Sequence, residues 1–197
     1  MPNVNEVRVG APDQKTTGAI KHAPVGTTLP TLSSITKAAV TLDAAFEGNE
    51  YVSEDGLTLT PSVSTESIKD WDLSTVRKVL TEFDGTISWT MISTNAGSLG
   101  IAFGADHVIE NAATTTHGAQ VSVSLGAHIP DPESFVFLMK DGDARMVIVV
   151  PNGQVTEVGE VTFAKNAAIG WNVTLSCYPD ANGESIYIYT DDGQVTA

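Results

Sequence analysis

The sequence predicts a mostly β fold: an antiparallel β-sandwich or barrel with one short flanking α-helix and an extended N-terminal arm. After Gly56, apolar residues alternate with serine and threonine in several short stretches, and this period of two is typical of strands with one buried face. Turn dipeptides separate these stretches, as they do in sandwiches and barrels. A helical spacing of apolar residues appears only in short segments.

Residues 1–31 contain four prolines and three glycines and no periodic apolar pattern. We expect this segment to be an extended arm without a core of its own, long enough to reach a neighbouring subunit. Residues 32–197 then form a single β-sandwich domain, because no internal repeat or second composition change is visible.

Two segments have helical spacing. Residues 35–47 predict a short helix, followed by a turn at 47–50. Residues 94–104 predict the flanking helix, with Ser93 or Thr94 as its N-cap and Gly104 at its end. Gly97 and Gly100 weaken this second helix by about 1 kcal/mol each.

The strand pattern starts at Leu57 and pauses in a polar loop, residues 64–74, before a second strand at 76–83. Asp84-Gly85 and Asn152-Gly153 have the composition of hairpin turns. A slip in the alternation near Gly159 predicts a β-bulge. The remaining strands are expected at 87–91, 121–125, 135–139, 146–150, 155–163, 171–177 and 186–189, with Asp141-Gly142-Asp143 and Asn182-Gly183 as turns.

The chain is strongly acidic, with 10 Lys and Arg against 24 Asp and Glu and a net charge of −14. This balance argues against nucleic-acid binding, which requires basic residues at the phosphates. An acidic surface instead repels a passing phosphate backbone. The single cysteine, Cys177, excludes an internal disulfide, and no apolar run is long enough to predict a membrane span.

No pattern of catalytic or metal-binding residues is present in the sequence, so we expect neither an enzyme nor a cofactor. His22, His107, His117 and His128 are far apart and match no zinc motif. The sequences at 180–183 and 191–193 begin like calcium loops but lack the closing glutamate, so we interpret them as turns.

Between Gly26 and about Gly104 the sequence resembles the major tail proteins of long-tailed bacteriophages, particularly those of actinobacterial hosts. The resemblance depends on the order and spacing of several short pieces and extends over roughly 80 residues. These pieces are GTTLPT at 26–31, LDAAF at 42–46, YVSEDGL at 51–57, IKDW at 68–71, the strand at 76–83 and the block that ends with IAFG at 101–104.

This resemblance implies a structural virion protein of the tail, made in the host cytoplasm, whose copies form hexameric rings. The rings stack into a hollow tail tube, through which the genome is ejected. The implied partners are the protein itself, the tape measure protein and the tail terminator, while DNA passes through the lumen without specific binding. Serine, threonine and acidic residues are expected to line that lumen.

Six residues are candidates for the assembly interfaces. Leu29 and Pro30 belong to the arm, and Ile68 and Trp71 are apolar residues in an otherwise polar loop, as at a contact anchor. Tyr187 and Tyr189 share one face of the last strand, opposite Ile186 and Ile188. Two alternatives stay open for Trp71 and the tyrosines: contact with a neighbouring subunit, or packing within their own.

Two other functions fit the same composition. One is a different self-assembling virion component, such as a head decoration or tail completion protein. The other is a carbohydrate-binding β-sandwich that uses Trp71, Trp89 and Trp171, although Trp89 and Trp171 lie in the apolar phase of their strands.

Overall fold

Antiparallel strands form most of the structure, a computed structural model that describes residues 7–13, 18–48 and 50–195. The described residues contain one α-helix, α1 (Ala96–Phe103). Two 3₁₀ helices, η2 (Leu32–Ser34) and η3 (Ala105–His107), accompany it. The strands are β1 (Ile20–Pro24), β2 (Val52–Lys69), β3 (Thr75–Met91), β4 (Val108–Asn111), β5 (Gln120–Val123), β6 (Glu133–Asp141), β7 (Ala144–Val158), β8 (Trp171–Tyr178) and β9 (Tyr187–Asp191).

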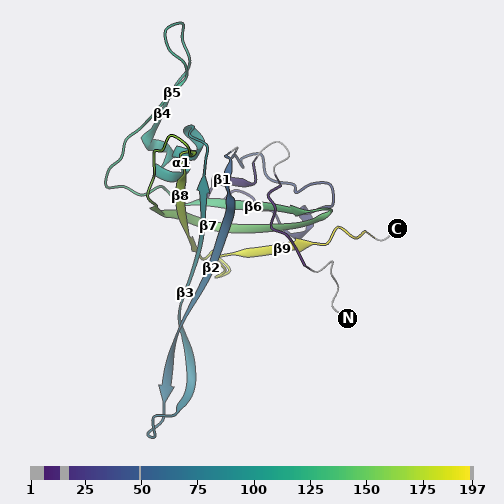
Figure 1. The fold of residues 1–197 in the computed structure, drawn as a ribbon. Coiled ribbons are helices and arrows are strands. Elements are labelled where there is room, and N and C mark those ends of the chain that lie inside the picture. The colour runs from purple at the N-terminus through teal and green to yellow at the C-terminus, as the bar shows by residue number, and fades with distance from the viewer. Residues whose placement is uncertain (1–6, 14–17, 49, 196–197) are drawn as a thin grey trace.

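The main sheet has the strand order β1-β6-β7-β8-β3-β2, and every pairing in it is antiparallel. Strand β7 is long enough to hold two partners on one edge, because Arg145–Val149 pairs with β9 and Asn152–Val158 pairs with β8. Strands β4 and β5 form a separate two-stranded ribbon. The ribbon and the β2–β3 hairpin extend from opposite ends of the body (Figure 1).

The main sheet curls over a core of aromatic rings. Trp89 of β3 lies 6.0 Å from Phe135 and 5.3 Å from Phe137, measured between ring centroids, although β3 is three strands away from β6 in the sheet order. Such contacts require the sheet to curl until β3 and β6 face each other across the core. Ile101 and Ala102 of α1 belong to the same buried cluster, so the helix closes one side of it. The predicted antiparallel β fold with one flanking helix is confirmed.

A second buried cluster lies on the opposite face of β6 and β7. There Val136, Leu138, Val147 and Val149 pack against residues of the 23–46 segment. Strands buried on both faces are continuous apolar runs rather than alternating ones. This explains the composition of 135–139 and 146–150.

The predicted helix at 35–47 is wrong. Described residues there form a bridge between Ile35 and Val40 and a series of local turns. Thr36 Oγ1 accepts a hydrogen bond from Ala39 N at 3.1 Å, and Asp43 Oδ1 accepts one from Ala45 N at 3.0 Å. Such bonds compete with helical ones, and the buried Ile35 and Phe46 hold the segment against β6 and β7.

Two predicted turns and the first part of the predicted polar loop are also wrong. Residues 64–69 belong to β2, Asp84-Gly85 lies inside β3, and Asn152-Gly153 lies inside β7. Gly85 is closely packed, because a Cβ there would be 2.9 Å from Ile186 Cδ1, so that side chain would have to shift. Glycine 153 similarly packs against the Leu175 side chain. These glycines mark close approach within a sheet rather than chain reversal.

The helix at 94–104 is confirmed as α1. Its N-cap is Asn95, one residue after the predicted caps, and the Asn95 side chain accepts a hydrogen bond from Ser98 N at 2.8 Å. The Asp141–Asp143 turn joins β6 to β7 as predicted. The register of β7 on β8 shifts between Val155 and Glu157, slightly before the predicted bulge. A search of the described residues finds no helix long and apolar enough to span a membrane.

Candidate assembly surfaces

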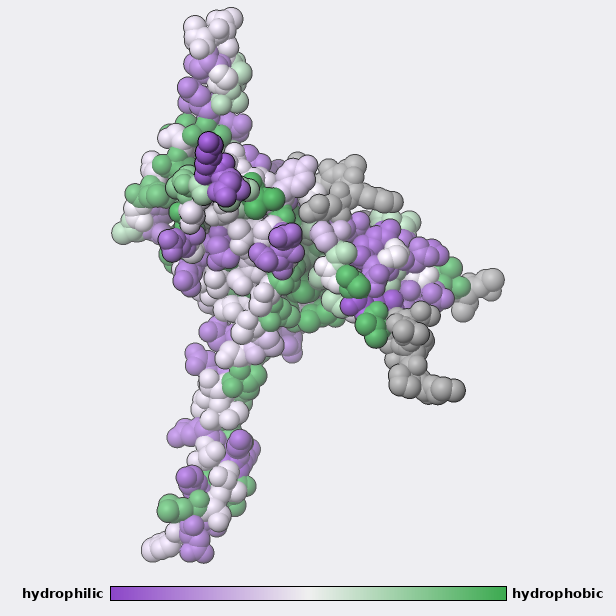
Figure 2. Space-filling model, in the orientation of Figure 1, coloured by the Kyte–Doolittle hydropathy of each residue, from purple (hydrophilic) through white to green (hydrophobic). Residues whose placement is uncertain are grey.

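The outer half of the β2–β3 hairpin is exposed along its whole length. Beyond the body, both strands are exposed on both faces, and Figure 1 shows the hairpin projecting as a long arm. Apolar side chains remain exposed along it, and Figure 2 shows them at intervals. These are Val63, Ile68, Trp71, Leu73, Val76, Val79, Leu80 and Phe83.

The hairpin tip has a defined turn geometry. Asp70 Oδ1 accepts hydrogen bonds from Asp72 N at 3.1 Å and Ser74 N at 2.8 Å, and Leu73 takes a left-handed conformation with φ of 65°. Trp71 lies in this turn and is 100% exposed. The structure therefore places the predicted pair Ile68 and Trp71 on the projecting hairpin, far from the core of the same chain.

The outward face of the body sheet is polar and continuous over four strands. Cross-strand partners share a face, and the pairs Thr58–Ser88, Ser88–Thr174 and Thr86–Ser176 connect β2, β3 and β8. Asn172 donates a hydrogen bond to Thr90 Oγ1 at 3.0 Å, and Ser176 bonds Thr156 of β7 at 2.8 Å.

Within the body, this face carries no basic residue and ends toward the hairpin in two carboxylates. We call it the polar sheet face and define it by Thr58, Thr60, Ser62, Glu82, Asp84, Thr86, Ser88, Thr90, Thr156, Asn172, Thr174 and Ser176.

The described part of the N-terminal arm lies on its own chain. Asp13 N donates to Leu138 O at 3.0 Å, and Lys140 N donates to Ala11 O at 2.8 Å, so residues 11–13 extend along the edge of β6 beyond β1. Asp13 also forms a buried ion pair with Arg145, which donates to Ala38 O at 2.8 Å. Residues 20–24 form strand β1, which the sequence did not indicate.

Three of the other four interface candidates contact the second buried cluster. Pro30 is buried, and Leu29, Tyr187 and Tyr189 pack partly against that cluster. Tyr187 donates from its hydroxyl to Asp180 Oδ2 at 2.9 Å and stacks on Tyr189. The tyrosines thus have partners in their own chain, while Ile188 on the other face of β9 is exposed.

His22 and Cys177 both have shifted pKa values. Burial lowers the pKa of His22, but the hydrogen bond from its Nδ1 to Glu133 Oε2 at 2.9 Å and the charges of Glu133, Glu50 and Glu47 outweigh burial and raise it. Burial raises the pKa of Cys177 to about 12, so this thiol is unreactive at neutral pH.

The three tryptophans are not brought together. Trp89 is 2% exposed in the core, Trp71 lies at the hairpin tip, and Trp171 packs edge-on against Phe103 of the helix. A carbohydrate platform made of all three is therefore not present. Among the described residues, no group of three His, Cys, Asp or Glu side chains is placed to hold a metal ion.

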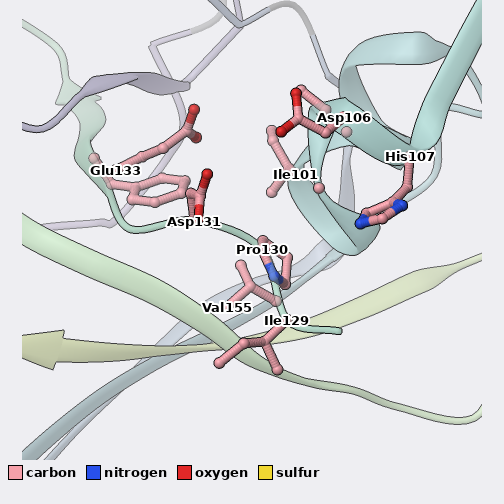
Figure 3. Close-up of a pocket in the computed structure, with 12 residues that line it drawn as sticks. Ile101, Asp106, His107, Ile129, Pro130, Asp131, Glu133 and Val155 are labelled. Carbon is pink, nitrogen blue, oxygen red and sulfur yellow. The ribbon is translucent and has the colours of Figure 1, made fainter. Parts of the chain in front are cut away.

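One feature that the sequence did not indicate is a cavity beside α1. It has a volume of about 180 Å³ and lies between the end of the helix and the segment that leads into β6. Figure 3 shows Asp106, Asp131 and Glu133 around it, with Ile101, Pro130 and Val155 forming apolar walls. The residues that form it come from distant parts of the sequence, which is why no local pattern predicts it.

An elongated antiparallel β protein with exposed apolar side chains on a projecting hairpin has the features of a structural subunit. A family model described as phage tail tube protein matches residues 2–197. The chain therefore belongs to the phage tail tube protein family, and it is a structural protein of the phage tail, as the resemblance at 26–104 implied.

Among solved structures, the chain is similar to the cap that terminates the tube of the anti-feeding prophage, determined by cryo-electron microscopy. The two share 12% sequence identity over 94% of each chain, with a TM-score of 0.44. No curated protein sequence matches the chain.

Proposed function

We propose that this protein assembles into hexameric rings that stack to form the tail tube, and that the tube is the conduit for genome ejection. The observation that carries the proposal is the outer half of the β2–β3 hairpin. A two-stranded ribbon is at best marginally stable alone in water, and a row of exposed apolar side chains marks a contact surface. A second copy of the chain supplies the missing contacts.

The polar sheet face supports the conduit role. Hydroxyl and amide groups with a few carboxylates offer phosphates no cation to bind, and the net charge of −14 repels a polyanion. We assign this face to the lumen, where DNA passes without specific binding and the tape measure protein is held beforehand. The tail terminator then contacts the last ring. Leu29, Pro30, Tyr187 and Tyr189 remain candidates for lateral contacts.

Electron microscopy of the purified protein tests the proposal directly. Rings or tubes of uniform width are expected, together with a hexameric mass by native mass spectrometry. The matched control replaces residues 63–83 by Asn-Gly, so that Ser62 and Asp84, already paired, are joined by a two-residue turn. This variant should fold and remain unassembled. A strictly monomeric wild-type protein at high concentration contradicts the proposal.

A second experiment tests the lumen assignment. Lysine at positions 86, 88 and 174 places cations on the polar sheet face, and tubes of this variant should retain nucleic acid, seen as a raised absorbance ratio at 260 to 280 nm. The control places lysine at positions 115, 116 and 122, in or beside the β4–β5 ribbon and off this face. Equal nucleic acid in both variants contradicts the assignment.

A further inference from the structure

The two ends of the molecule carry unlike surfaces. The hairpin tip lies at one end of the long axis, and α1 with the β4–β5 ribbon lies toward the other (Figure 1). The tip is a protrusion with exposed apolar side chains, whereas the α1 end has a cavity. A protrusion and a cavity at opposite ends of one chain cannot meet within that chain, but they can meet between two copies in the same orientation.

The cavity combines an apolar interior with an acidic opening. Ile101, Phe135 and Val155 contribute its apolar lining, and Asp106 and Asp131 are exposed at its edge (Figure 3). Glu133 is bound to His22, but among the described residues Asp106 and Asp131 have no ion-pair partner. The volume of about 180 Å³ is sufficient for an aromatic ring, since an apolar cavity of roughly 150 Å³ holds benzene.

The surface beside this cavity is also apolar. Ile129 is 60% exposed and Leu125 is 71% exposed, and a second hollow, lined by both, adjoins the first. Exposed aliphatic side chains around a hollow are typical of a contact surface. The α1 end therefore offers apolar area beyond the cavity itself.

The hairpin tip complements this end in polarity, while its charges are mixed, because Asp70 and Asp72 flank Trp71 and basic residues lie close behind. Trp71 and Leu73 are 100% and 75% exposed, so the tip presents an indole and a leucine to solvent. Three of the ten basic residues of the chain, Lys69, Arg77 and Lys78, lie at or just behind the tip. Among the described residues none of the three forms an ion pair.

We propose that Trp71 of one copy inserts into the cavity beside α1 of the copy in the next ring. The indole packs against the apolar walls, and its N–H donates to a carboxylate at the opening. The basic residues behind the tip then face Asp106 and Asp131. This inference rests on the proposed function, because it names the contact by which stacked copies hold each other.

Disulfide trapping tests the contact. One full-length chain carries Asp72→Cys, which leaves Trp71 in place, and the other carries Asp131→Cys. Both substituted residues are exposed, so folding is not at risk. The natural Cys177 is buried and does not compete. After co-assembly and mild oxidation, a cross-linked dimer is expected, because insertion brings the two positions within the short Cα separation that a disulfide requires. The control pairs Asp72→Cys with Lys165→Cys, an exposed site outside the cavity.

The outcomes separate the two proposals. About tenfold more cross-linked dimer for the Asp131 pair than for the Lys165 pair supports insertion, since only positions held together form the bond efficiently. Normal tubes with equal or absent cross-linking overturn insertion but leave the tail tube function intact. Absence of any ring or tube from the unsubstituted protein overturns the proposed function and this contact with it. As a second measurement, Trp71→Ala should leave single rings but shorten or abolish stacks, and stacks of normal length would also overturn the inference.

Discussion

The two halves of strand β3 differ in their surroundings more than in their composition. Residues 85–91 alternate between buried and half-buried positions, whereas residues 75–84 are exposed at every position. Yet the outer half still carries Val76, Val79, Leu80 and Phe83. What separates the halves is that the inner half has β8 beside it and β6 across the core.

The difference shows that the outer hairpin has more apolar side chains than a solvent-facing loop would have. Those side chains are nevertheless not buried as they would be in a core. Val63 and Phe83 are cross-strand partners on the same face as Ile87 and Trp89. The apolar face of the body therefore continues onto the hairpin after the covering elements end. In the unassembled chain this apolar face of the outer hairpin is exposed to water, and contact between copies buries it.

Hydrogen exchange gives the largest expected contrast. Backbone amides of 85–91 should be strongly protected in the unassembled protein, whereas those of 75–84 should exchange faster by about two orders of magnitude or more, because local opening there disrupts few contacts. Assembly should protect the outer half. Equal protection of both halves before assembly would contradict the conclusion that the outer half of β3 is less stably packed than the inner half.

Trp89→Ala should cause the largest loss of stability among the substitutions considered. Trp89 is 2% exposed and contacts two phenylalanine rings, so its truncation should lower the free energy of unfolding by about 3–5 kcal/mol. Urea denaturation of the unassembled protein measures the change. A loss of unfolding free energy smaller than that of an ordinary surface substitution would contradict the placement of Trp89 in the core.

Gly97→Ala should destabilise the body although alanine favours helices. A Cβ at position 97 would overlap with Oε1 of the buried Glu50, and overpacking of this kind costs about 1–3 kcal/mol. The matched control is Gly100→Ala, where the nearest atom is Ala105 Cα at 3.7 Å. That variant should be neutral or more stable by up to about 1 kcal/mol. Thermal denaturation of the pair distinguishes steric conflict from helix propensity.

His22→Gln should reduce stability in a pH-dependent way. The pKa of His22 is raised above its usual 6.5 in the folded protein, so the protonated pair with Glu133 stabilises the fold fully below the unfolded pKa. That contribution is lost as the pH rises through the folded pKa.

The difference in unfolding free energy between wild type and this variant should therefore be about 1 kcal/mol near pH 6, and smaller near pH 9. His117, which forms no ion pair among the described residues, serves as the control when it is substituted in the same way. If the difference in unfolding free energy between wild type and the variant grew with pH, the predicted direction of the effect would be contradicted.

Trp71→Ala should have the smallest effect on the unassembled protein. The side chain is 100% exposed, and surface substitutions usually change stability by less than about 0.5 kcal/mol. Compared with Trp89→Ala, the same chemical change is then nearly silent in one half of the hairpin and severe in the other. A loss similar to that of Trp89→Ala would mean that Trp71 folds onto its own subunit.

The sequence was sufficient for the fold class and for the α1 helix, because both depend on local period and capping. It failed where a long-range contact overrode a local signal. Asp84-Gly85 has the composition of a turn, yet Gly85 lies inside β3, where it pairs with Cys177 and packs against Ile186. The segment at 35–47 has helical spacing, yet its apolar residues are used to cover β6 and β7.

The candidate surfaces were predictable only in part. An apolar pair in a polar setting indicated Ile68 and Trp71, and alternation indicated the serine and threonine positions of β8. Which strands join into one polar sheet face depends on pairing partners that are distant in sequence. The cavity beside α1 likewise needs the chain at 129–135 to lie against the helix, and no local pattern encodes that approach.

The opposite directions of the β2–β3 hairpin and the β4–β5 ribbon give the molecule an intrinsic polarity (Figure 1). In a filament whose copies all share one orientation, the copies at one terminus expose their hairpin tips. The copies at the other terminus expose their β4–β5 ribbons and the α1 end. Such a filament is chemically different at its two termini. A protein that caps one terminus has no matching surface at the other, so initiation and arrest of growth require two distinct recognition events.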